Sequence, residues 1–168
     1  LLYEVNKIDG IERIRLGSLD PFFISKEVVD ALREIRKLCP HFHISLQSGS
    51  SRTLAAMRRK YNADKALERI LYLKNSFPCC NLFADVIVGF PGETEEDFQD
   101  TVHFIETVRF LHLHIFPYSQ REDTEAAAMP CQIAPEIKKD RASRLAEIQS
   151  VIKNELLNNF IKSGQKAN

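Results

Sequence analysis

The segment Asp85–Glu95 joins an apolar strand directly to the start of a helix, and it limits the possible folds more than any other feature. Its first half is rich in β-forming residues, Pro91 and Gly92 turn the chain, and Thr94 then begins a helix with Asp97 three residues later, as in a capping box. Backbone groups at the end of such a strand are exposed. In a parallel α/β sheet this strand-end position is where small molecules bind.

Strand and helix patterns alternate along the whole chain. Short apolar runs predict strands at residues 14–16, 43–46, 82–88 and 111–116. Helical spacing of apolar residues predicts helices from Ser25 to Pro40, from 49 to 57, from 63 to 76, from Thr94 onward and from about Pro135 onward. This alternation indicates an α/β fold with a parallel sheet. The last residues, Ser163–Asn168, are expected to be frayed.

Four strand–helix units amount to half of an eight-unit barrel, which takes ~250 residues. The expected fold is therefore a partial parallel (β/α) barrel of about four βα units with a long C-terminal helix. A sheet of this kind leaves an exposed edge, which favours pairing between copies of the chain. A dimer formed in that way would not represent the native assembly.

The composition sets limits on partners and location. The chain has 168 residues and is 44% apolar, enough for one globular domain. Lysine plus arginine equals aspartate plus glutamate at 23 each, so any contact with RNA is local or made by another part of the protein. No apolar run of membrane-spanning length and no signal peptide are evident, which predicts a soluble, cytoplasmic protein. Leu1 is not methionine, and the opening resembles the tail of a helix, so we expect a piece of a longer protein.

The cysteines and histidines give no sign of a metal centre. Cys39, Cys79, Cys80 and Cys131 lack the short spacers of zinc or cluster sites and are interpreted as reduced residues with no shared role. His112 and His114 lie two apart on a predicted strand and point the same way, but no third ligand is evident. The remaining histidines are interpreted as surface or loop residues: His41, His43 and His103.

Four predicted strands end in polar residues on one side of the sheet, at 17–20, 47–50, 85–93 and 118–119. Acidic and amide groups there suit the vicinal hydroxyls of a ribose. Taken singly, the serines are better explained as helix caps than as ligand groups. Gln47 differs because a long amide is a poor cap, and Asp85 differs because a carboxylate in a buried strand needs a partner. From the residues alone, a functional role for these two is as well supported as a structural one.

Five motifs in order resemble the radical S-adenosylmethionine methylthiotransferases: residues 13–21, 43–50, 57–61, 85–94 and 114–121. The sequence at 16–21, 116–119 and 129–130 is most similar to the branch that acts on threonylcarbamoyl-adenosine in tRNA. That branch adds a methylthio group to carbon 2 of the adenine beside the anticodon. Sister branches share most of these motifs and act on isopentenyl-adenosine in tRNA or on a ribosomal protein.

The resemblance implies roles for individual residues. Gln47 and Asp85 match positions that hold the ribose hydroxyls of S-adenosylmethionine. Arg59 matches the position that pairs with the methionine carboxylate, whereas its basic run, taken without the resemblance, favours a solvated turn. Ser18 matches a polar position near the methionine amino group. The adenine is expected to contact Ile87, Gly89, Phe116 and Pro117.

One part of the family pattern is missing, because the C-x-x-x-C-x-x-C triplet that holds the catalytic 4Fe-4S cluster does not occur. The four cysteines cannot replace it, since cluster ligands converge from a compact loop. Residues 1–168 are therefore predicted to be the C-terminal portion of the radical domain, without the N-terminal cluster domain or the C-terminal RNA-binding domain. The chain alone is predicted to be inactive, while the full-length protein uses S-adenosylmethionine, 4Fe-4S clusters and tRNA.

Two other functions remain open. A degenerate half-barrel would bind a nucleotide or a partner protein without catalysis. An ordinary barrel enzyme would use Glu93 or Asp20 as a general base. The basic residues early in the last helix are interpreted as a solvated face, with contact to tRNA phosphates as the alternative: Lys138, Lys139, Arg141 and Arg144.

Overall fold

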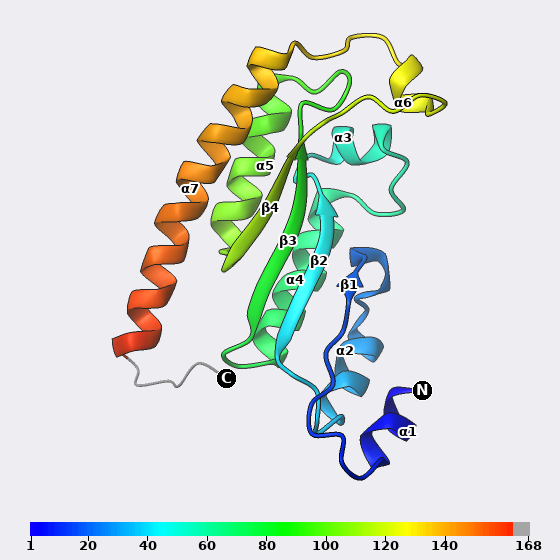
Figure 1. Cartoon of the computed structure of the whole chain (residues 1–168), viewed down its shortest axis with the longest axis vertical. Coiled ribbons are helices and arrows are strands. Elements are labelled where there is room, and N and C mark those ends of the chain that lie inside the picture. Colours follow the sequence, from blue (N-terminus) through cyan, green and yellow to red (C-terminus); the bar gives the residue numbers. More distant parts are fainter. Residues whose placement is uncertain (163–168) are drawn as a thin grey trace.

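The computed structural model describes residues 1–162, so the predicted fraying of Ser163–Asn168 lies outside the described residues. Four parallel strands form one open sheet in sequence order (Figure 1). They are β1 (Ser18–Leu19), β2 (His41–Gln47), β3 (Asn81–Val88) and β4 (His112–Pro117). The predicted α/β fold with about four strand–helix units is confirmed.

Helices follow each strand, and the longest closes the chain. They are α1 (Leu2–Lys7), the 3-10 turn η1 (Pro21–Phe23), α2 (Lys26–Arg33), α3 (Ser51–Ala56), α4 (Ala63–Ser76), α5 (Glu95–Val108), α6 (Glu125–Ala128) and α7 (Pro135–Lys162). Ser25 caps α2 and the capping box of Thr94 and Asp97 starts α5, as the sequence predicts. Within residues 1–162, no helix combines the length and the apolar character needed to cross a membrane.

The prediction was wrong in the first strand–helix unit. The first strand lies at Ser18–Leu19 rather than at 14–16, and α2 ends at Arg33 instead of continuing to Pro40. The cause is a bridge between segments, in which Ile14 donates to the carbonyl of Lys37 and accepts from the amide of Cys39. Because those backbone groups pair across the chain, they cannot also continue a helix.

The two faces of the sheet differ in burial. In β2, Phe42, Ile44 and Leu46 are fully buried against the helical layer, and each such side chain stabilises the fold by about 1.5–3 kcal/mol. The alternating residues of β2 and β3 point to the opposite face and are only half-buried. That face has no helix of its own in residues 1–162 (Figure 1). His43, which lies within the predicted strand, and His41 are half-buried on this face, which corrects their interpretation as surface or loop residues.

Helix α7 packs along α5 and β4 (Figure 1). Leu145 and Ile152 lie on its buried stripe, and so do Arg141 and Gln149. Gln149 donates to the carbonyl of Leu111, just before β4. The buried Arg141 corrects the prediction that the basic residues at the start of this helix form a solvated face.

Candidate functional site

Two adjoining cavities lie at the carboxyl ends of β2, β3 and β4, near α3 and α6. Gln47, Ile87 and Ala126 line both of them. The larger, of about 730 Å³, also includes Arg59 and the turn around it. The smaller, of about 470 Å³, also includes Asp85. The structure therefore brings the predicted amide, guanidinium and carboxylate to one connected region.

Gln47 ends β2 in an unusual backbone conformation. Its φ is +68°, in the left-handed region, and the register of β2 against β3 shifts between Ile44 and Gln47, as in a β-bulge. A residue with a side chain pays about 1–2 kcal/mol for this conformation. The Gln47 side chain has no hydrogen-bond partner within residues 1–162 and lies in the wall of both cavities. Strain combined with an uncommitted amide is typical of a ligand-binding position.

Asp85 lies in the middle of β3, on the half-buried face of the sheet. Its Oδ1 is 2.8 Å from Nε2 of His43, and the two side chains are 23% and 27% exposed. No lysine or arginine among residues 1–162 forms an ion pair with it. The group nearest to this carboxylate is thus a neighbouring imidazole, while the second oxygen remains able to accept from a ligand.

Arg59 is held at the cavity by a carboxylate. Its Nη1 lies 3.1 Å from Oδ2 of Asp20, and both side chains are about 30% exposed. Asp20 also accepts from the amide of Phe22 and so caps η1. This pair fixes one edge of the guanidinium and leaves the other nitrogens for an anion. The engagement of Asp20 leaves it poorly suited to the general-base role considered above.

Apolar residues supply the rest of the smaller cavity. Ile87 and Phe116 are register partners on β3 and β4, and Pro117 follows on β4. Phe116 is 51% exposed, which is unusual for a large aromatic side chain. These three residues offer a flat apolar wall of the kind that accepts a purine ring.

Two predicted residues do not line either cavity. Ser18 is exposed on β1, where it pairs with His43 in the sheet. Gly89 faces α7: its φ is +71°, and a Cβ there would overlap Cγ of Lys138. Its amide donates to Oε1 of Glu93 at 2.8 Å. The structure gives Gly89 a packing role that explains why the side chain is absent.

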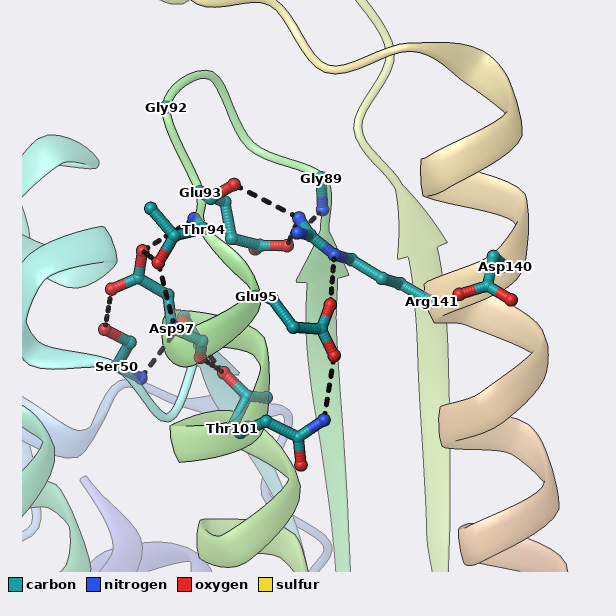
Figure 2. A network of polar contacts seen from close by, with 12 residues as sticks. Ser50, Gly89, Gly92, Glu93, Thr94, Glu95, Asp97, Thr101, Asp140 and Arg141 are labelled. Carbon is teal, nitrogen blue, oxygen red and sulfur yellow. Dashed lines mark hydrogen bonds and ion pairs between the residues drawn. The ribbon is translucent and has the colours of Figure 1, made fainter.

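Glu93 lies at the centre of a buried network beside the cavities (Figure 2). Oε1 of Glu93 is 2.7 Å from Nη1 of Arg141, and the two side chains are 2% and 6% exposed. Burial raises the pKa of Glu93, against the opposing effects of the Gly89 amide and of Arg141. Figure 2 shows Arg141 reaching from α7 to the loop between Gly89 and Thr94. Because Oε1 of its carboxylate accepts from both the Gly89 amide and Arg141, Glu93 is a structural group and is poorly suited to act as a general base.

Asp97 continues this network towards α3. It accepts from the hydroxyl of Ser50 at 2.8 Å and from the amide of Thr94 at 2.8 Å, and it pairs with Arg52. Burial by itself would raise the pKa of Asp97, but the hydrogen bond from Arg52, followed by those from Thr94 and Ser50, lowers it to about 2. The hydroxyl of Thr101 donates to the backbone carbonyl of Asp97 and accepts from the backbone amide of Gly49. The turn that follows Gln47 is therefore anchored to α5.

Helix α6, which forms part of the cavity wall, was not predicted from the sequence. Glu125, Ala126 and Met129 line the larger cavity, and Glu125 forms an exposed ion pair with Arg58 across its mouth. The position of α6 in the chain could have indicated this role, because the segment follows the carboxyl end of β4, where ligand sites of parallel sheets lie.

Sequence comparisons relate the chain to known proteins. The family model for the Radical SAM superfamily matches residues 1–105. The chain is 44% identical over 161 residues to a tRNA-2-methylthio-N(6)-dimethylallyladenosine synthase of Acetivibrio thermocellus, which covers 96% of this chain and 34% of the relative. A relative of the same name from Alkaliphilus oremlandii is 45% identical over 166 residues, with 96% and 35% covered. Another from Geotalea uraniireducens is 43% identical over 166 residues, with 99% and 38% covered. The chain spans about a third of the length of these relatives.

Proposed function

The chain belongs to the radical S-adenosylmethionine superfamily, and from that premise we propose that it is the C-terminal portion of the radical domain of a tRNA methylthiotransferase. The observation that carries the proposal is the connected pair of cavities at the strand ends. Gln47 lines both, Arg59 lines one and Asp85 the other. A single adenosyl ligand with a charged methionine end would span this arrangement.

The residues fit S-adenosylmethionine by donor type. The uncommitted amide of Gln47 and the second oxygen of Asp85 would hold the two ribose hydroxyls. Arg59, fixed on one edge by Asp20, would pair with the methionine carboxylate. Ile87 and Phe116 would contact the adenine.

These residues would act by binding and orienting, which is the protein's share of such a reaction. When bound beside a reduced 4Fe-4S cluster, S-adenosylmethionine would supply the radical chemistry at the target carbon. The cluster ligands are proposed to come from outside this chain. Within residues 1–162 the cysteines form no group of three that could hold a metal.

The relatives' names favour dimethylallyladenosine, also called isopentenyl-adenosine, as the nucleoside. This is the alternative branch of the sequence analysis rather than the threonylcarbamoyl-adenosine branch preferred there. We therefore propose that the full-length protein adds a methylthio group to carbon 2 of that adenosine in tRNA, in the cytoplasm. The role of Ser18 near the methionine amino group and the pairing between copies of the fragment remain predictions.

The site is tested by S-adenosylmethionine binding to the full-length protein, measured by isothermal titration calorimetry. Asp85→Ala is expected to weaken binding by about 10- to 100-fold, because a hydrogen bond to a charged group contributes roughly 1.5–3 kcal/mol. Gln47→Ala is expected to weaken it by about 3- to 10-fold, as a neutral hydrogen bond contributes roughly 1 kcal/mol.

Ser45→Ala is the matched control, because Ser45 lies on the same strand and face as Gln47 but lines neither cavity. It should leave affinity unchanged. Wild-type affinity in both Gln47→Ala and Asp85→Ala would remove the site assignment. The nucleoside is tested separately by mass spectrometry of tRNA from cells with and without the gene. Loss of the methylthio form of threonylcarbamoyl-adenosine instead of that of dimethylallyladenosine would overturn the substrate proposal alone.

A further inference from the structure

Three metal-ligating side chains meet on the open face of the sheet, one from each of three neighbouring strands. They are His43 on β2, Asp85 on β3 and His114 on β4. One ligand atom from each lies within 4.8 Å of those of the other two. Within residues 1–162 they are the group of three found with this property.

The sheet register produces this meeting. Asp85 and His114 are direct partners in the pairing of β3 with β4, so their side chains leave the same face at the same height. His43 is the register partner of Phe83, which lies two residues before Asp85, and its ring reaches forward to the carboxylate. No single strand carries this pattern, which is why the sequence showed a histidine pair without a third ligand.

The two imidazole rings of the group lie parallel to each other. The rings of His43 and His114 are stacked, with centroids 5.2 Å apart and planes inclined by 3°. Nε2 of His43 is buried and, although it lies 2.8 Å from Oδ1 of Asp85, the contact is not directed as a hydrogen bond. A buried ring nitrogen without a hydrogen bond costs free energy unless something else occupies it.

We propose that His43, Asp85 and His114 bind a divalent first-row transition ion such as Zn²⁺ or Fe²⁺. Two imidazoles and one carboxylate on one face of the ion are a ligand set that these metals accept, with other coordination positions left open. Metal–ligand bonds of about 2.0–2.2 Å bring ligand atoms to about 3.0–3.5 Å from one another. The His43–Asp85 pair is already near that separation, and the ring of the exposed His114 needs to move by at most about 1.5 Å.

The ion would lie in the wall of the smaller cavity, which Asp85 also lines. Coordination through Oδ1 leaves the other carboxylate oxygen able to accept from a ligand in that cavity. The metal site is therefore compatible with the adenosyl ligand and does not depend on it.

The test is titration of the 168-residue chain, labelled with ¹⁵N, with Zn²⁺. Long-range nitrogen–proton spectra report on the ring nitrogens of all five histidines. One equivalent of Zn²⁺ is expected to shift the signals of His43 and His114 and to leave those of His41 and His103 in place. Zn²⁺ that perturbs only signals near the cysteines, or no signals at all, overturns the proposal.

Variants identify the ligands. His114→Gln is expected to weaken Zn²⁺ binding, measured by calorimetry, by about 100-fold or more, since loss of a group outside the coordination sphere already costs about 10- to 100-fold. His114 is exposed, so the variant should fold, which its circular dichroism checks. His103→Gln, an exposed histidine on α5, is the matched control and should bind as wild type. Equal affinity in both variants would contradict the proposal.

Discussion

The ends of β2 and β3 both adopt a backbone conformation with positive φ, but the two positions serve different roles. Gln47 is the last residue of β2 and Gly89 directly follows β3, and both have a positive φ, at +68° and +71°. At the end of β2 a side chain is kept in spite of the strain, and its amide has no partner within residues 1–162. At the end of β3 the side chain is absent, and Glu93 four residues later is tied to Arg141. The first arrangement is typical of a binding position and the second of a structural one.

The largest expected effect comes from breaking the structural side of this comparison. Arg141→Met is expected to destabilise the chain by about 3–5 kcal/mol, because it leaves the buried Glu93 without its partner. Urea unfolding measures the change. Arg144 lies on the same helix as Arg141. Arg144→Met removes its exposed ion pairs with Glu95 on α5 and Asp140 on α7 and should cost less than about 1 kcal/mol. Similar losses in the two variants would show that burial of the Glu93 pair is not what matters.

A smaller effect is expected from pH at Asp97. Its folded pKa of about 2 is below the ordinary value of 3.8, so ionised Asp97 stabilises the fold above pH 3.8, and this contribution is lost as the pH falls towards 2. One pKa unit corresponds to about 1.4 kcal/mol, so the contribution is roughly 2 kcal/mol. The difference in unfolding free energy between wild type and Asp97→Asn should therefore narrow from pH 5 to about pH 2. A difference that stays constant over this range would refute the lowered pKa.

The smallest expected effect is a gain in stability rather than a loss, and it concerns Gln47, the binding position of the comparison. Gln47→Gly is expected to stabilise the chain by about 1 kcal/mol, because glycine accepts the left-handed conformation without strain. Thermal or urea unfolding measures the gain. Ser45→Gly, at a position of β2 whose φ is not positive, should instead destabilise by about 0.5–1 kcal/mol. Destabilisation by Gln47→Gly would mean that the residue is retained for packing rather than for a ligand.

Local patterns in the sequence predicted the elements that local interactions determine. The capping box of Thr94 and Asp97 and the bounds of α4 were correct because caps and apolar spacing act over a few residues. Gln47 and Asp85 were identified because each is out of place in its own strand. The end of α2 was missed because the bridge from Ile14 competes with the helix from a distant part of the chain.

By itself, the sequence determined the order of strands and helices and the polar residues at the strand ends, since these depend on periodicity and turn chemistry. Tertiary structure alone decided which side chains meet. Arg141 looked like a solvated cation and is buried on Glu93, and His43 looked like a surface or loop residue and lies 2.8 Å from Asp85, close to His114. Such pairings depend on sheet register and helix packing, which bring together residues far apart in the chain.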